Sequence, residues 1–378
     1  MKRNLGLRLS VLCIMLLVTV SGLAGLTGSY VDAAGSKQDK LVAEALDLKH
    51  TLRFDKNGKF KIVIFSDIQE TYPVHTDTMD YINKILDREK PDLVLLGGDN
   101  HAGANVSKSV MKTYLNSISE PMESRKIPWA QVYGNHVEGG YKANVANLYG
   151  CATKEEQQKI FESYTYNVSK AGNVYGVGNY VLPILRSDSE KIGFNVFALD
   201  SHSYTNENPG GQAFEDAVFL KRGVYGGILY PTLRYETFHF DQVRWYWDTS
   251  VALEAYNGAK VPAMMLYHIP VLEFETVARN PKETGMTGSN MDGTGPSEVY
   301  CGLFQTCYER GDVKGMFVGH CHRNDFVGTY MGIQLGFVPT IGSLAYYDAD
   351  IRGARVIEID QNDAWNFTTR MVYCKDIK

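Results

Sequence analysis

Short apolar runs along the chain end abruptly in glycine or in a polar side chain. Residues 93–96, Leu-Val-Leu-Leu, form the clearest run, and Gly97, Gly98 and Asp99 follow directly. An unbroken apolar run of this length is typical of a strand buried on both faces of a sheet. Because open α/β sheets bind ligands at the carboxyl ends of their strands, such endings are candidate functional positions. Similar strands are predicted over residues 60–65, 127–133, 191–199, 261–267 and 313–318.

Between several of these runs, apolar residues recur with the period of a helix. Residues 76–90 have this spacing and stop before Pro91, whose ring disfavours a helical residue before it. This helix separates the runs at 60–65 and 93–96, so the three segments form a β-α-β unit and the sheet is at least partly parallel. Further helices are predicted over residues 110–120, 154–163, 240–255 and 297–310.

The remaining segments have less regular patterns. Residues 52–66 alternate around Asn57-Gly58 and predict a hairpin, and residues 332–373 predict antiparallel strands. Residues 203–238 are rich in Gly, Tyr and Pro and are interpreted as an irregular insertion. Residues 281–297 are rich in Gly, Asn, Thr and Pro, which indicates a mobile loop and a candidate lid.

The amino terminus has a pattern of its own. Three basic residues precede a mostly apolar stretch, residues 9–20, and small residues follow at 31–34. This order is typical of a secretory signal peptide, so we predict that residues 1–34 are cleaved and that the protein is secreted or extracytoplasmic. The alternative is an uncleaved membrane anchor, because residues 9–26 are nearly long enough to span a bilayer.

Composition and charge exclude some classes of function. Of 378 residues, 44% are hydrophobic and 21% are charged, as in ordinary globular proteins, and we predict a single domain over residues 51–378. The formal net charge of −5 becomes −7 when residues 1–33, with three basic residues and one acidic residue, are removed. This charge argues against general nucleic-acid binding and against an anionic-membrane binder. The six cysteines are irregularly spaced and do not indicate a disulfide framework.

Five strand endings carry side chains that are suited to metal ions. Carboxylates, imidazoles and amide oxygens are the ligands of divalent ions that activate water. One carboxylate can bridge two such ions at about 3.5–4 Å, the separation at which both can grip a phosphoryl group, and we assign this role to Asp99. The five endings are Asp67-x-Gln69, Gly98-Asp99-Asn100, Gly134-Asn135-His136, His268 and Gly319-His320-x-His322.

This ordered set resembles the calcineurin-like metallophosphoesterase superfamily, whose pattern is DxH, GD, GNH, H and GHxH. The resemblance spans residues 62–326, and the GDN block is similar to short purple-acid-phosphatase relatives that lack an N-terminal domain. It implies an α/β fold, a four-layer α-β-β-α sandwich with two mixed sheets. It also implies a hydrolase that binds two divalent metal ions (Mn, Fe or Zn) and hydrolyses phosphomonoesters or phosphodiesters by metal-bound hydroxide. We expect the protein to be a monomer. Its partner is then a phosphate-ester substrate, and a membrane only if the amino-terminal segment stays uncleaved.

The resemblance also assigns roles to residues. It implies that His136 is catalytic and contacts the substrate without binding a metal ion. His101 and His202 follow motif endings closely and are candidate substrate contacts, although a structural role is the alternative for each. One metal ion would take Asp67, Gln69, Asp99 and His322, and the other would take Asp99, Asn135, His268 and His320.

Three positions depart from the family pattern. Gln69 stands where a histidine is usual, Ala102 stands where purple acid phosphatases have a metal-bound tyrosine, and Val137 follows His136 where an acidic residue is frequent. A purple Fe(III) site is therefore not expected. Gln69 and Val137 also favour an alternative function, in which the protein is a non-catalytic extracytoplasmic binding protein that retains a weakened metal site.

Overall fold

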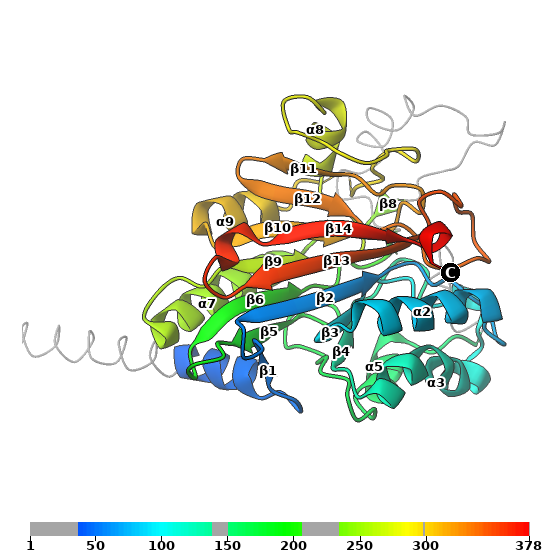
Figure 1. Cartoon of the computed structure of the whole chain (residues 1–378), viewed down its shortest axis with the longest axis horizontal. Helices are drawn as coiled ribbons and strands as arrows, with labels where there is room; N and C mark the ends of the chain where they lie inside the picture. The colour runs from blue at the N-terminus through cyan, green and yellow to red at the C-terminus, as the bar shows by residue number, and fades with distance from the viewer. Residues whose placement is uncertain (1–36, 138–149, 206–233, 298, 378) are drawn as a thin grey trace, which may run out of the picture.

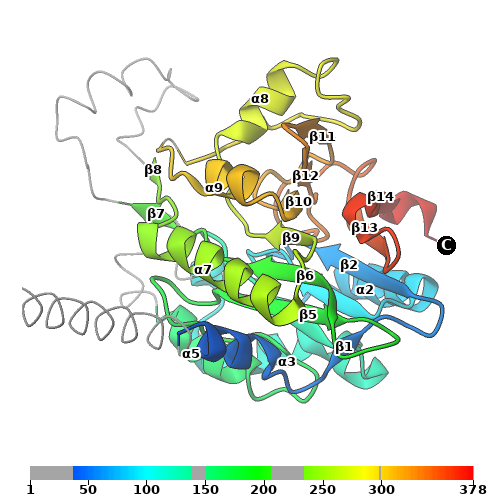
Figure 2. The same ribbon diagram turned by 90° about the vertical axis from the view of Figure 1, so that its left-hand side faces the viewer.

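Two β-sheets packed face to face form the centre of the protein, and helices cover their outer faces (Figures 1 and 2). The computed structural model describes residues 37–137, 150–205, 234–297 and 299–377. These residues form an α-β-β-α sandwich in which both sheets are mixed. The fold is therefore the four-layer α/β sandwich that the sequence predicted.

The smaller sheet has five strands. In order across the sheet, they are β14 Thr368–Tyr373, β13 Gly353–Asp360, β2 Lys59–Phe65, β3 Leu93–Leu96 and β4 Trp129–Gln131. β2, β3 and β4 are parallel, and β2 and β3 are joined by the helix α2 (Thr76–Glu89), which confirms the predicted β-α-β unit. Ile62 and Ile64 of β2 face the other sheet, whereas Val63 and Phe65 face the helices. Because both faces are buried, the apolar run is unbroken.

The larger sheet has seven strands. In order, they are β1 Leu52–Arg53, β5 Tyr180–Leu185, β6 Ile192–Ala198, β9 Ala263–Leu266, β10 Val313–Val318, β12 Ile333–Phe337 and β11 Val327–Tyr330. β6, β9, β10 and β12 are parallel, so their carboxyl ends meet at one edge of the sheet. A separate pair, β7 (Tyr204–Thr205) and β8 (Arg234–Tyr235), is antiparallel.

Helices form the two outer layers. The smaller sheet is covered by α2, α3 (Lys108–Arg125) and α5 (Lys154–Phe161), which share one apolar core with it. The larger sheet is covered by α7 (Phe240–Asn257), α8 (Glu273–Arg279) and α9 (Leu303–Arg310), which share a second core. A third core lies between the sheets. Short 3-10 turns occur at η1 Gly103–Asn105, η3 Ala364–Asn366 and η4 Cys374–Asp376.

The predicted hairpin over residues 52–66 is wrong. The turn exists, since Gly58 N–H donates to Asp55 O at 2.9 Å. However, β1 pairs with β5 in the larger sheet, whereas β2 pairs with β3 and β13 in the smaller sheet. β1 and β2 each pair with the strands that bury them, and a local turn signal does not specify which strands those are.

Other differences concern element ends and short elements. The helix predicted from residue 297 starts only at Leu303, because Gly302 has a left-handed backbone with φ of 77°. α3 continues through Pro121, where the prediction ended it. In the predicted antiparallel tail, β13 and β14 are antiparallel as expected, but β12 is parallel to β10. The sequence reading did not identify β5, β11 or α8.

Several predictions concern the ends and loops of the chain. Residues 37–46 are helical, but the predicted signal peptide or anchor, residues 1–34, lies outside the described residues. In the part of the chain that is described, none of the helices has the length and hydrophobicity needed to cross a membrane. Most of the predicted insertion, residues 206–233, also lies outside the described residues. The loop 281–297 pairs with the body through single bridges to β11 and Asn324, and its role as a lid stays a prediction.

Candidate metal centre

The ends of strands from both sheets bring three ionisable side chains together. Asp67 and Asp99 follow the adjacent parallel strands β2 and β3, and His268 follows β9 of the larger sheet. One possible ligand atom from each of the three lies within 4.8 Å of the others, and all three side chains are at most 1% exposed. The meeting edge of the two sheets therefore holds two buried carboxylates and an imidazole.

The other predicted ligands surround this group. Gln69 Nε2 donates to Asp99 Oδ2 at 2.9 Å, and His322 Nε2 lies 3.3 Å from Asp67 Oδ1. The structure thus brings all seven predicted ligands to one place. His320 completes the set, since its Nδ1 lies 2.9 Å from Asn135 Oδ1 and its ring lies 5.3 Å from the ring of His268.

The backbone at this centre adopts an unusual conformation. Four of the predicted ligands have positive φ angles, and such residues cost on the order of 1–3 kcal/mol each when they are not glycine. Residues strained in this way cluster at functional sites, because the surrounding fold must hold them there. The four are Asp67 at 52°, Gln69 at 38°, Asp99 at 45° and His320 at 74°.

Two glycines of the motifs are required by close packing. A Cβ atom at Gly98 would lie 2.5 Å from His268 Nδ1, and a Cβ atom at Gly134 would lie 2.3 Å from Asp99 Oδ1. Either contact is far below van der Waals separation. The glycines therefore let the backbone approach the carboxylate and imidazole side chains directly.

Two histidines are oriented as metal-binding histidines usually are. Nδ1 of His268 lies 2.9 Å from Gly97 O, and Nδ1 of His322 lies 2.8 Å from Tyr346 O. A carbonyl oxygen only accepts, so each Nδ1 carries the proton and each Nε2 faces the carboxylates. Hydrogen bonding of the distal ring nitrogen is the common outer-shell arrangement that fixes a ligand histidine. The ring of Tyr346 also stacks on His322 at 4.3 Å.

The charges and unpaired polar atoms at the centre fit a bound cation. Burial raises the pKa of Asp99 and of Asp67, yet the neighbouring histidines outweigh this effect, so both pKa values lie below their ordinary range. Burial lowers the pKa of His268, but Asp99 and Asp67 raise it above its ordinary value. Within the described residues, Asp67 Oδ1 and His268 Nε2 make no hydrogen bond. Buried carboxylate oxygens without donors fit metal ions, which take carboxylate, imidazole and amide ligands.

His136 differs from this group in its exposure. Its side chain is 37% exposed and its Nε2 lies 4.0 Å from Asp99 Oδ2, while its backbone N–H donates to Asp99 Oδ1 at 2.8 Å. The imidazole therefore lies at the solvent-facing rim of the centre, beside the ring of Tyr204.

The two candidate substrate contacts lie apart from the buried carboxylates. His101 is fully buried, its Nε2 lies 3.1 Å from Gln157 Oε1, and burial lowers its pKa to about 4. Nε2 of His202 lies 2.8 Å from Gln242 Oε1. The structure does not bring either ring into the Asp67–Asp99 group, and substrate contact stays a prediction for both.

Several supporting residues were not identified from the sequence. Ser66 Oγ donates to Asp67 Oδ2 at 2.7 Å, and Ser201 Oγ accepts the backbone N–H of Ile269 at 2.9 Å. Asn135 Nδ2 donates to Tyr204 Oη at 2.8 Å, so the other atom of the amide, Oδ1, faces His320. Ser66 directly follows β2, which was an available signal, whereas Ser201 lies three residues after the end of β6. Tyr204 has no such signal, because its position depends on the pairing of β7 with β8.

An α-β-β-α sandwich with paired aspartates and histidines at the strand ends is the arrangement of the metallophosphoesterase fold. The chain belongs to the calcineurin-like phosphoesterase family, whose model matches residues 60–252. This family membership confirms the resemblance that the five motifs indicated.

Individual relatives share low sequence identity with this chain. The "Probable inactive purple acid phosphatase 29" of Arabidopsis thaliana is 27% identical over 83% of this chain and 80% of its own length. The "Phosphatase DCR2" of Saccharomyces cerevisiae is 27% identical over 71% of this chain and 45% of its own length. Among solved structures, a dimetal phosphatase from Danio rerio has a TM-score of 0.46 and 11% identity, covering 82% of this chain and 98% of that one.

Proposed function

We propose that the protein is an enzyme that binds two divalent metal ions and hydrolyses phosphomonoesters or phosphodiesters. The observation that carries this proposal is the pair of buried carboxylates, Asp67 and Asp99, which face Nε2 of His268 and of His322. In a neutral imidazole with its proton on Nδ1, Nε2 carries a lone pair and cannot donate a hydrogen bond to a carboxylate. Such a group is costly to bury unless cations occupy it. Membership of the calcineurin-like phosphoesterase family supports the same chemistry.

The contacts support the two ligand sets implied by the motifs. Asp67, Gln69, Asp99 and His322 would hold one ion, and Asp99, Asn135, His268 and His320 would hold the other. We propose that these ions are Mn, Fe or Zn. When bound, they supply an activated water nucleophile and withdraw charge from the phosphoryl oxygens.

The residues around the ions have separate tasks. Tyr204 fixes the side-chain amide of Asn135 and so aims its oxygen at the centre. The exposed imidazole of His136 is placed to contact the substrate, where it can stabilise developing negative charge or donate a proton to the leaving oxygen. The backbone N–H of His136 donates to Asp99, which ties the catalytic imidazole to the bridging carboxylate.

A second candidate function is a non-catalytic binding protein that keeps a weakened metal site. The hydrogen bond from Gln69 Nε2 to Asp99 Oδ2 supports it, because it occupies a lone pair of the carboxylate that would bridge the two ions. Some Arabidopsis relatives are also named "probable inactive" purple acid phosphatases.

The experiment that separates the two functions is hydrolysis of an aryl phosphate monoester and an aryl phosphodiester by the metal-loaded protein. We expect turnover that is lost on chelation and restored by Mn²⁺ or Zn²⁺. Asp99→Asn should abolish turnover and lower metal content together, because Asp99 would touch both ions. Asp87→Asn, which changes an aspartate that is 67% exposed, is the matched control. Metal-loaded wild-type protein that turns over neither ester would favour the binding protein.

We also propose that the enzyme acts outside the cytoplasm as a monomer. The basic and apolar pattern of residues 1–34 supports export. Mass spectrometry of the exported protein would identify a cleaved amino terminus, whereas an intact terminus in the membrane fraction would support an anchor.

A further inference from the structure

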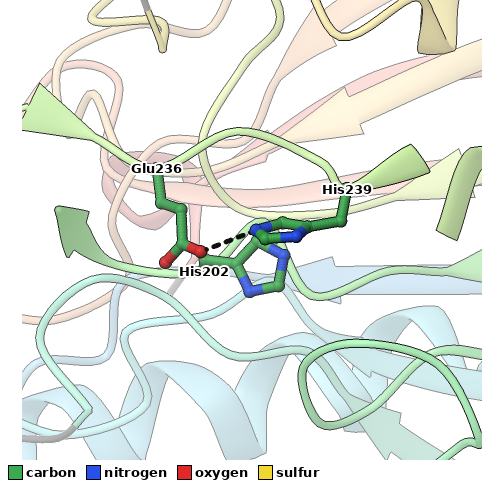
Figure 3. A group of neighbouring side chains, drawn as sticks. All are labelled: His202, Glu236 and His239. Carbon is green, nitrogen blue, oxygen red and sulfur yellow. Dashed lines mark hydrogen bonds and ion pairs between the residues drawn. The ribbon is translucent and has the colours of Figure 1, made fainter. Parts of the chain in front are cut away.

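We propose that His202, Glu236 and His239 bind a further divalent ion, such as Zn²⁺. This site shares no residue with the dinuclear centre, and its ion would stabilise a neighbouring segment rather than take part in the reaction. One possible ligand atom from each of the three lies within 4.8 Å of the others. Figure 3 shows the two imidazole rings and the carboxylate converging, with His239 Nε2 2.9 Å from Glu236 Oε1. Two imidazoles and one carboxylate form a common zinc ligand set.

The spacing suits a single ion. Zinc bonds to nitrogen and oxygen are about 2.0–2.2 Å long, so two ligand atoms of one ion lie at most about 4 Å apart. His239 and Glu236 already meet this limit, and His202 is close enough to reach it by a small side-chain adjustment. Three protein ligands leave one tetrahedral position for water.

The two histidines are held in place by shared neighbours. Gln242 Oε1 lies 2.8 Å from His202 Nε2 and also accepts the backbone N–H of His239 at 2.8 Å. The ring of Tyr175 stacks on His239 at 3.7 Å and packs edge-on against His202 at 5.0 Å. Little side-chain entropy would therefore be lost when an ion binds.

The backbone of His202 provides an independent observation. His202 is only 4% exposed and has a φ angle of 64°, in the left-handed region that costs a non-glycine residue energy. The strain is consistent with a fold that holds this side chain at a functional position. It directs the buried imidazole toward His239, whose ring centroid lies 5.3 Å away.

Charge and access also favour a cation. Asp200 Oδ2 lies 3.8 Å from His202 Nδ1, but Asp200 is already paired with Lys154 at 2.8 Å, so Glu236 supplies the carboxylate ligand. The side chains of Glu236 and His239 are 25% and 39% exposed, which leaves a path from solvent. The site is thus buried at one end and open at the other.

An ion at this position would act on the dinuclear centre through neighbouring residues. It would tie residues 200–205 to residues 234–239, the two segments that β7 and β8 bring together. Ser203 Oγ donates to Asn135 O at 2.9 Å, and Tyr204 Oη accepts from Asn135 Nδ2 at 2.8 Å. The ion would therefore stabilise the segment that orients Asn135.

The test is Zn²⁺ titration of the metal-free full chain in an Asp67→Asn/Asp99→Asn background, which removes both carboxylates of the dinuclear centre. We expect one tight Zn²⁺ per chain in that background, together with a rise in melting temperature on Zn²⁺ addition. Adding His239→Ala should abolish both signals, and adding Glu236→Gln should weaken binding at least tenfold while keeping side-chain size. His50→Ala, at a histidine that bonds to Thr165 O instead, is the matched control and should change neither signal.

Two outcomes would overturn the proposal. The first is a background variant that is folded but takes up no Zn²⁺. The second is an unchanged Zn²⁺ stoichiometry after His239→Ala with only a lower melting temperature, which would identify a simple ion pair. Because these measurements use no substrate, they are independent of whether the dinuclear centre hydrolyses phosphate esters.

Discussion

Removing the charge of Lys154 should destabilise the protein strongly. Lys154 begins α5, and its Nζ lies 2.8 and 3.0 Å from the two carboxylate oxygens of Asp200, which follows β6. The side chains are 7% and 0% exposed. In Lys154→Met the length of the side chain is kept, but among the described residues Asp200 then keeps two backbone donors, Val177 and His202, and the His202 imidazole 3.8 Å away.

The expected cost follows from this burial. Removing one partner of a buried ion pair leaves an uncompensated charge and costs about 3–5 kcal/mol in the free energy of unfolding. For a chain of this size, that corresponds to a fall in melting temperature of about 2 °C per kcal/mol, or roughly 6–10 °C. Lys59→Met is the control, because Lys59 is 62% exposed and its pair with Asp360 should contribute only about 0–1 kcal/mol.

Urea unfolding followed by tryptophan fluorescence, with thermal unfolding beside it, would measure the three proteins. A second variant, Lys154→Met/Asp200→Asn, should recover much of the loss, since it leaves no buried charge. If Lys154→Met costs less than about 1 kcal/mol, as expected for the exposed pair, water must solvate Asp200 and the reasoning fails. The same conclusion holds if the double variant is no more stable than the single one.

Two further predictions concern the candidate centre. His136→Ala should leave metal content unchanged and lower kcat by about 10²–10⁴ if the imidazole is a general acid; an equal loss on esters with good and poor leaving groups would indicate charge stabilisation instead. Gln69→His should tighten the ion held with Asp67 and shift its preference from Mn²⁺ toward Zn²⁺, because imidazole is a softer ligand than an amide oxygen. Titration of metal-free protein with both ions would detect this, and identical isotherms for wild type, Gln69→His and Gln69→Ala would exclude Gln69 as a ligand.

Patterns along the sequence predicted the parts of the fold whose signals are local. The run at 93–96 is β3, and residues 313–318 are β10, since an apolar stretch buried on both sides needs no knowledge of its partners. β5 was missed, and Pro183 within it weakens the signal of a strand. The sequence also did not predict which strands pair with each other. The Asn57-Gly58 turn is present, but β1 and β2 belong to different sheets.

The candidate centre was predictable for the same reason. Asp67 and Asp99 follow adjacent parallel strands, which end at one edge of the smaller sheet, so these two had to meet. His268 follows β9 of the larger sheet, and only the family resemblance indicated that it joins them. The grouping of His202 with Glu236 and His239 was not predictable, because the sequence between them has no periodic pattern that predicts an element. Only the pairing of β7 with β8 brings these side chains together.

The position of β13 has a consequence for the order in which the molecule can form. β13 pairs with β2 along its length, so that Lys59 bonds to Asp360, 301 residues later in the chain. Until β13 has been synthesised, β2 remains an edge strand, although Asp67 at its end and all the other centre residues already exist. Pairings this distant in sequence close slowly, because the loop must be ordered before any contact rewards it. We therefore expect the candidate metal centre to reach its final geometry late, after the last strands of the protein have been synthesised.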